Sequence, residues 1–426
     1  MSRCSTPAVS SPGTRSSGCE RRAHPLSAGT DLRDVTGLPT VTAARPLAHV
    51  PALDGLRGVA VMLVMGLHVG LAVVPGGQVG VLIFFSLSGF LITQLLLDDL
   101  RGQRQRVLRR FYARRALRLV PAWLSVVVAC GVLAWLWPEM ERAEATIDGL
   151  PMVLLHLGNW SRAFEGAGSL GVLDHTWSLA VEEQFYLVWP FVLLLVLRLT
   201  RRMWVVAAVA GTGCCAALAA RMAVDGVGAG ALDRVYNGTD TQADHLMLGC
   251  ALAVVVTLAR ERGGVPQLRA VLTRLAAPAA IFLAALTVVF PFEGASVGYR
   301  LTLSAVAVAS AVLVGAAYLS GAGCIAQVLG AAWLRWAGVR SYGLYLWHYP
   351  VIAVVTSTGL VPFTLPKQVI EVALSLAVAA ASYRWVEQPF LRRKKGCRAV
   401  DPGLNRAGPP MCGTPLPAGH RQQRSP

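Results

Sequence analysis

The sequence predicts an all-α, polytopic integral membrane protein, a helical bundle of about ten transmembrane helices with both termini in the cytoplasm. Composition is the first reason: of 426 residues, 54% are hydrophobic and only 15% are charged, and the mean hydropathy is +0.53. A water-soluble globule of this length is not expected to be so apolar. The other two reasons are a series of long apolar stretches and an alternation of charge in the connections between them.

Each predicted span has roughly the 20 mostly apolar residues that a helix needs to cross the hydrocarbon core. In chain order the spans are residues 58–74, 77–97, 119–137, 179–197, 203–224, 241–259, 275–292, 301–320, 339–360 and 366–386.

Every second connection between these spans is strongly basic, as is the tail that follows the last one. The basic segments are residues 101–118, 198–202, 260–274, 335–340 and 392–395. Positive charge in short loops marks the cytoplasmic side, so we expect a multi-pass protein of the cell's inner (plasma) membrane. The same clusters account for the net charge of +16, and no nucleic-acid partner is expected.

The two ends of the chain differ in composition from its body. Residues 1–50 and 396–426 lack a sustained apolar stretch and are rich in Pro, Gly and Arg, so both are predicted to be disordered tails. Residues 51–395 remain as the membrane domain. The nine cysteines show neither metal-ligand spacing nor a disulfide framework, and we expect no metal site and no bound cofactor.

Ionisable residues inside apolar spans are costly and mark candidate functional sites. His68 lies eleven residues after Arg57, almost three helical turns, which puts both side chains on one helix face about 16 Å apart. Arg57 would then lie at the cytoplasmic rim and His68 near the midplane. A ligand with an anionic head and a long reactive arm, such as a coenzyme A thioester, fits that spacing. A snorkelling Arg and a hydrogen-bonded His remain the structural alternative.

A second polar group enters the fourth span. Trp177 and Ser178 are followed by the adjacent carboxylates Glu182 and Glu183. Neighbours on a helix differ by 100°, so at most one of the two carboxylates can face the same cavity as His68. We choose Glu182, because it lies four residues after Ser178 and on its face. Acidic residues also favour a helix N-terminus, which would explain one of the two without function.

Arginine is abundant between the second and third spans, where most of it is expected to set topology and to bind anionic lipid. Arg115 and Arg118 lie one turn apart and are the predicted contacts for CoA phosphates. Asp240, at the outer end of the sixth span, is a weaker candidate for substrate binding, since helix capping explains part of its position. Tyr342, Tyr345, His348 and their neighbours are interpreted as structural.

Several segments resemble the successive signatures of the acyltransferase 3 family of integral membrane O-acyltransferases. They are LDGLRGVAVMLVMGLH, IFFSLSGFLIT, FYARRALRLVPAW, HTWSLAVEEQFYLVWP, TDTQADHLMLG, SYGLYLWHYP and SYRWVEQPF, in family order over nearly the whole body. Gln242 departs from the pattern, since the family often has a basic residue there. We expect no extracytoplasmic hydrolase-like domain after the last span, unlike longer members.

The resemblance implies an acyl-CoA-dependent O-acyltransferase with a ten-helix core and roles for the residues that match Arg57, His68, Arg115, Arg118 and Glu182. It implies acceptors such as surface polysaccharides, O-antigens, peptidoglycan or macrolides. Our hypothesis is direct transfer of a short acyl group, with His68 as general base and Glu182 compensating the imidazolium.

Trp177, Ser178 and Asp240 complete the predicted substrate-binding set, and a covalent acyl-enzyme on Ser178 is the less favoured mechanism. The rival functions are a membrane transporter or exporter that uses the buried His and Glu as a proton relay, and a lipid-binding scaffold without chemistry.

Overall fold

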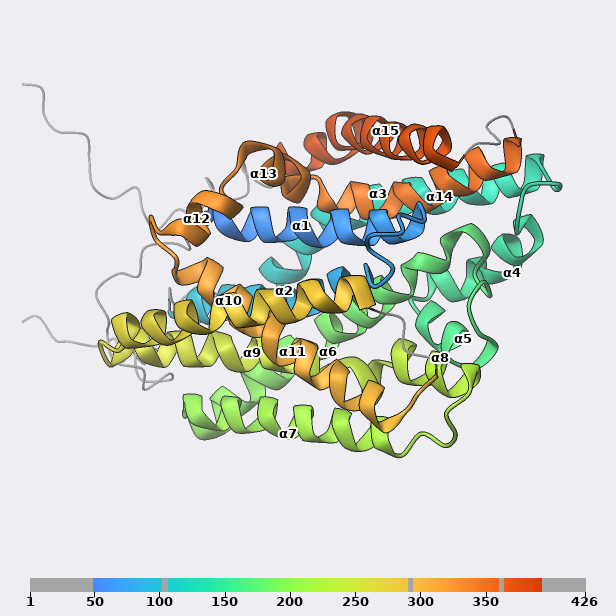
Figure 1. Ribbon diagram of the computed structural model, residues 1–426. Coiled ribbons are helices and arrows are strands. Elements are labelled where there is room, and N and C mark those ends of the chain that lie inside the picture. The colour runs from blue at the N-terminus through green and yellow to red at the C-terminus, as the bar shows by residue number, and fades with distance from the viewer. Residues whose placement is uncertain (1–48, 102–105, 290–293, 360–363, 393–426) are drawn as a thin grey trace, which may run out of the picture. The chain divides into compact units, whose positions relative to one another are not determined.

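The computed structural model describes residues 49–101, 106–289, 294–359 and 364–392. Within these ranges every regular element is a helix (Figure 1). The predicted disordered tails, residues 1–50 and 396–426, lie almost wholly outside the described residues, so that prediction is not tested.

The long helices lie side by side in the bundle, and short helices join them at the two ends (Figure 1). The long helices are α1 (Pro51–His68), α2 (Val79–Arg101), α3 (Val107–Leu136), α6 (Trp177–Thr200), α7 (Met203–Met222), α9 (Thr239–Glu261), α10 (Val265–Val289), α11 (Val297–Leu319), α14 (Ser341–Thr358) and α15 (Thr364–Ser382). The short ones are α4 (Ala143–Leu154), α5 (Gly158–Glu165), α8 (Ala229–Asn237), α12 (Cys324–Leu329) and α13 (Ala332–Val339). A 3₁₀ turn, η2 (Gly171–Thr176), precedes α6, and a π-helical turn, η3 (Tyr383–Glu387), follows α15.

Eight of the described helical segments are long and apolar enough to cross a membrane. They contain α2, α3, α6, α7, α9, α10, α11 and α15, which confirms a polytopic, all-α membrane protein. The first and ninth predicted spans correspond to α1 and α14, which have 18 residues each and are not among the eight. Both carry several polar side chains, and they pack against each other. The count of ten spans therefore stays a prediction.

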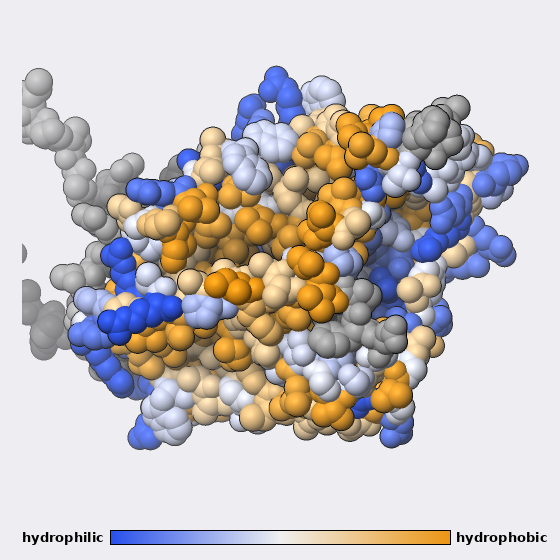
Figure 2. All heavy atoms as spheres, viewed as in Figure 1, coloured by the Kyte–Doolittle hydropathy of each residue, from blue (hydrophilic) through white to orange (hydrophobic). Residues whose placement is uncertain are grey.

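The surface has the polarity that a bilayer requires. Apolar side chains cover the middle of the bundle on the face in Figure 2, and hydrophilic ones gather toward its two ends. Large apolar residues such as Leu195 and Val289 are 57% and 75% exposed, which in a spanning helix means contact with lipid.

Small residues let the helices of the core approach closely. A Cβ atom built on Gly89 of α2 would lie 2.0 Å from the backbone oxygen of Leu246 in α9, and one on Gly249 would lie 2.3 Å from the oxygen of Ser86. Close packing of backbones stabilises helix association in membranes, because the hydrophobic effect contributes little to association between helices that are already in lipid.

Helix α1 begins earlier and ends earlier than the sequence predicted. It runs from Pro51 to His68, whereas the predicted span was 58–74. The helix ends because Gly70 takes a positive φ of 74° and the amide of Leu71 donates to the oxygen of Gly66, 2.9 Å away. His68 is therefore the last residue of α1 and not an interior one, while its predicted position near the midplane of the membrane stays a prediction.

Candidate active site

A cavity of about 330 Å³ opens among α1, α2, α3, α6 and α14. Its volume falls in the range of ~300–1,000 Å³ that is typical of small-molecule sites. Its lining includes Arg57, Arg115, Arg118, Ser178 and Glu182, five of the residues that the sequence predicted for the site. Arg57 and Glu182, which are 125 residues apart in the chain, thus line the same cavity.

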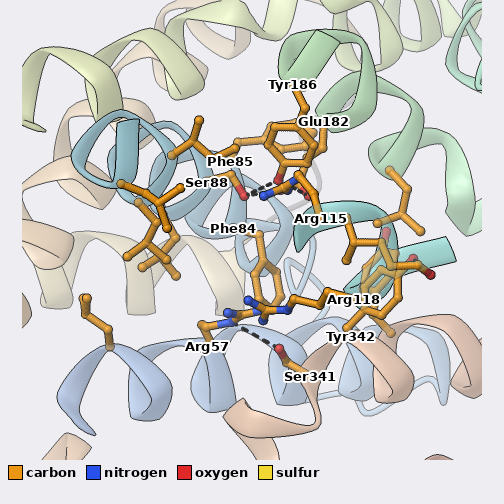
Figure 3. Close-up of a pocket in the computed structure, with 18 of the residues that line it drawn as sticks. Arg57, Phe84, Phe85, Ser88, Arg115, Arg118, Glu182, Tyr186, Ser341 and Tyr342 are labelled. Atoms are coloured by element: carbon orange, nitrogen blue, oxygen red, sulfur yellow. Dashed lines mark hydrogen bonds between the residues drawn. The ribbon is translucent and has the colours of Figure 1, made fainter. Parts of the chain in front are cut away.

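Three guanidinium groups converge in this cavity (Figure 3). Arg57 donates from Nε to Oγ of Ser341 at 3.3 Å, and the Arg115 guanidinium lies 3.1 Å from the centre of the Tyr186 ring. Arg118 has no hydrogen-bond or ion-pair partner among the described residues, and its charge is repelled by those of Arg57 and Arg115. Like charges held together around a cavity favour an anionic ligand, which would relieve the repulsion.

Carboxylates also line the cavity, so its charge is mixed. Glu182 accepts hydrogen bonds from Oγ of Ser88 at 2.6 Å and from the Tyr186 hydroxyl at 2.8 Å (Figure 3). Asp54 lies in the same lining. With both oxygens of Glu182 bonded, this carboxylate is held in one orientation beside Arg115, and the arginines outnumber the carboxylates three to two.

Ser178 and Tyr345 close the cavity on the side nearest His175. The Tyr345 hydroxyl donates to the backbone oxygen of His175 at 2.8 Å, and a carbonyl can only accept. The tyrosine has one hydroxyl hydrogen, so Oγ of Ser178 must donate in the 2.6 Å bond between the two side chains. The serine lone pairs therefore remain free to accept a hydrogen bond from a ligand.

His68 is not part of the cavity lining. Its Nδ1 lies 2.9 Å from the oxygen of Val64 and 3.1 Å from Nε2 of His348. The described hydrogen bonds of Glu182 are to Ser88 and Tyr186, so in this structure the carboxylate does not contact the imidazole. The predicted pairing of His68 with Glu182 has no direct contact to support it.

The hydrogen bonds of the two histidines fix the tautomer of His68. Nδ1 of His348 lies 3.0 Å from the oxygen of Leu344, and it must carry the hydrogen because that carbonyl only accepts. Nε2 of His348 is then an acceptor. The hydrogen on Nδ1 of His68 is shared between Val64 and His348, which leaves Nε2 of His68 with a free lone pair, the form that a general base requires.

A third imidazole completes this polar group. The ring of His175 lies 5.3 Å from that of His348 and stacks at 5.3 Å on Tyr349, which in turn lies 5.0 Å from His68. His175 is only 2% exposed, and its buried Nδ1 has no hydrogen-bond partner in the described part of the chain. We call His68, His175 and His348 the histidine cluster. It lies beyond the Ser178–Tyr345 pair that closes the cavity.

Two predicted site residues lie elsewhere. Trp177 is 4% exposed, and its ring packs against Phe85 and Tyr236 at 6.1 and 5.0 Å between centres. Asp240 forms a bidentate ion pair with Arg234, in which the two guanidinium nitrogens lie 2.9 and 2.6 Å from the two carboxylate oxygens. Neither lines the cavity, so their predicted substrate contacts have no geometric support here.

The sequence interpretation missed the part played by α14. It assigned Tyr345 and His348 to a structural role, yet they contact Ser178 and His68. The available signal was spacing: Ser341, Tyr345 and His348 recur at i, i+4 and i+7, one face of a helix, and Ser341 bonds Arg57. Among the described residues, no group of three or more His, Cys, Asp or Glu side chains could hold a metal ion.

Comparison with known proteins gives one family. A family model described as an acyltransferase domain matches residues 50–384. The peptidoglycan O-acetyltransferase OatA of Listeria monocytogenes is 34% identical over 362 residues, and the putative peptidoglycan O-acetyltransferase YrhL of Bacillus subtilis is 33% identical over 362 residues. Each alignment covers 82% of this chain and 56% of the relative, so the chain spans little more than half of their length.

A putative O-acetyltransferase of Staphylococcus aureus is 29% identical over 375 residues, which cover 84% of this chain and 60% of that protein. No solved structure gives a significant match.

Proposed function

Because the chain belongs to the acyltransferase 3 family of integral membrane O-acyltransferases, we propose that it transfers a short acyl group, such as acetyl, from acyl-CoA to a saccharide hydroxyl. The observation that carries this proposal is the convergence of Arg57, Arg115 and Arg118 in one cavity that ends at Ser178 and Tyr345. We favour a saccharide over a macrolide acceptor, because two similar proteins are named for peptidoglycan O-acetylation.

The donor enters the cavity from the end of the bundle at which α1 and α14 begin. We take that end as cytoplasmic, because the basic connections lie there and positive charge favours the cytoplasmic side. The phosphates of CoA bind the three guanidinium groups, and the pantetheine arm extends toward Ser178. Acyl-CoA is a co-substrate in this scheme, and the enzyme needs no bound cofactor.

The chemistry requires one proton acceptor. The acceptor oxygen attacks the thioester carbonyl, Nε2 of His68 takes the hydroxyl proton, the C–O bond forms and the C–S bond breaks. The proton then passes to the departing sulfur, which gives free CoA and the O-acyl product. Nε2 of His68 suits this task since its lone pair has no hydrogen-bond partner among the residues that the structure describes.

The two reactants meet at His68, beyond the Ser178–Tyr345 pair. This pair separates the cavity from the histidine cluster, so the Tyr345 side chain has to turn aside when the thioester reaches His68. Two hydrogen bonds of its hydroxyl and ring contacts with Phe84, His175 and His348 hold Tyr345 across the path, so this movement has to break them.

Purified protein in detergent with labelled acetyl-CoA and a soluble peptidoglycan fragment tests the proposal. We expect CoA release and a product heavier by one acetyl group, and loss of both in His68→Ala. No gradient exists in detergent, so a transporter would consume no acetyl-CoA. Absence of CoA release by protein that still binds CoA would overturn acyl transfer as its function.

A further inference from the structure

A second cavity, of about 380 Å³, lies between α3 and α6 on the other side of Arg115. We call it the α3–α6 groove. It shares part of its wall with the first cavity, through Arg115, Leu119, Leu179, Tyr186 and Tyr342. The adjacent carboxylates of α6 divide between the two spaces: Glu182 lines the first cavity and Glu183 lines the groove.

Glu183 is an acidic group in the lining of the groove. It makes no hydrogen bond or ion pair within the described part of the chain, although the charge of Arg115 acts on it. By contrast, both amide atoms of Gln184 form hydrogen bonds. Its Nε2 donates to the backbone oxygen of His156 at 2.8 Å, and its Oε1 accepts from the Thr239 hydroxyl. A carboxylate only accepts, so the groove offers an acceptor for hydroxyl or N–H donors of a ligand.

An aromatic pair forms the lip of the groove. The rings of Trp123 and His156 stack 4.8 Å apart at 29°. The backbone of His156 takes a φ of 54°, which non-glycine residues seldom adopt, and the Gln184 amide bonds its carbonyl oxygen. Burial lowers the pKa of His156, so the imidazole stays neutral near pH 7. The lip is thus a fixed, uncharged aromatic surface.

The mouth of the groove faces hydrocarbon. Val120, Leu155 and Leu187 line it and are 48%, 67% and 63% exposed. Val120 and Leu187 belong to segments that qualify as membrane spans, so these side chains contact lipid tails. A ligand reaches Glu183 from this side only if an apolar tail keeps it in the bilayer.

From these observations we propose that the α3–α6 groove binds the saccharide head of a glycolipid from the bilayer. The sugar packs against Trp123, donates a hydroxyl hydrogen to Glu183, and leaves its lipid tail beside Val120 and Leu187. This site goes beyond the proposed acyl transfer and does not depend on it. The shared wall also means that a ligand in one cavity can alter binding in the other, through Arg115 and Tyr186.

Photo-crosslinking in phospholipid nanodiscs tests this proposal without any turnover. The probe is a glucosyl diacylglycerol with a diazirine on the sugar, and the matched probe has its sugar hydroxyls methylated. We expect crosslinks of the first probe to the α3 and α6 residues of the groove, and at least tenfold fewer with the methylated probe. Glu183→Gln should weaken crosslinking by about tenfold, as expected for a lost bond to a charged acceptor, and Val120→Trp should block it.

Val188→Trp is the matched control, because Val188 is 58% exposed on α6 but does not line the groove, and its crosslinking should stay unchanged. CoA binding to each variant checks that the other cavity is intact. Equal crosslinking by both probes, or by a phospholipid diazirine, would mean that the groove holds bulk lipid and would overturn the proposal. Full crosslinking of Glu183→Gln would overturn the role of the carboxylate. A failure of acyl transfer would leave these results unaffected.

Discussion

Nε2 of His348 lies 3.1 Å from Nδ1 of His68, and the first of these nitrogens can only accept. The histidines stand 280 residues apart in the chain and belong to α14 and α1. His348 is 1% exposed, so its ring has no other arrangement available without repacking. It therefore orients the imidazole of His68 and keeps the lone pair on Nε2, as the carboxylate of a hydrolytic triad does for its histidine.

Removing that acceptor should slow the chemical step. We expect His348→Leu to lower kcat for O-acetylation about 10- to 100-fold, part of the ~10²–10⁴ that a positioned general base supplies. The KM for acetyl-CoA should stay within about twofold, because His348 does not line the cavity. His348→Gln, which can still present an acceptor near the same position, should recover much of the rate. A loss of donor affinity with unchanged kcat would contradict this role.

The arginines of the cavity should control donor affinity. Arg118→Ala removes a guanidinium that has no hydrogen-bond or ion-pair partner among the described residues, and it should raise the Kd for CoA about 10- to 100-fold, the effect of one charge-assisted hydrogen bond. Titration calorimetry with CoA at two salt concentrations measures this change. Arg109→Ala is the control, because Arg109 is exposed on the same helix and lies outside the cavity lining. Equal effects of the two substitutions would indicate a general loss of positive charge.

Ser178 should assist binding without forming a covalent intermediate. Its hydroxyl donates to Tyr345, and no carboxylate or imidazole of the described residues bonds it directly. Ser178→Ala should therefore weaken acetyl-CoA binding by about 2- to 10-fold, the worth of a neutral hydrogen bond, and should retain product formation. Intact-protein mass spectrometry after mixing with acetyl-CoA should show no added acetyl group. An acetyl adduct on Ser178 that vanishes on addition of acceptor would establish the covalent route.

The sequence could predict the parts of the site that a single helix determines. The three-turn spacing of Arg57 and His68, the shared face of Ser178 and Glu182, and the divergence of Glu182 from Glu183 all follow from 100° per residue. Apolar length and loop charge likewise predicted a helical membrane bundle. These features depend on local geometry, which the order of residues specifies directly.

Features that depend on packing between distant helices were not predictable in this way. No local rule indicates that His68 pairs with His348 and not with Glu182, since this follows from how α1 packs on α14. The sequence also gave no sign that Tyr345 would stand between the cavity and the imidazole. The early end of α1 was predictable from Gly70, because glycine readily takes the positive φ that ends a helix.

The buried ion pair of Arg221 and Asp244 should stabilise the fold and leave the chemistry untouched. Arg221 is fully buried, donates to Asp244 at 2.6 Å and also holds the backbone oxygen of Thr241, while Asp244 accepts from Ser304 and His245. Neither Asp244 nor His245 lines the cavity or the groove.

Arg221→Met leaves the carboxylate buried without its cation, and the loss expected for a broken buried pair is about 3–5 kcal/mol of unfolding free energy. The double variant Arg221→Met with Asp244→Leu removes both charges and should recover most of that loss, since an apolar pair of similar size costs little to bury. Thermal unfolding in one detergent compares the three proteins, and CoA binding reports on the cavity. If the double variant were less stable than Arg221→Met, the two charges would act independently, and the pairing inferred from the 2.6 Å contact would not govern stability.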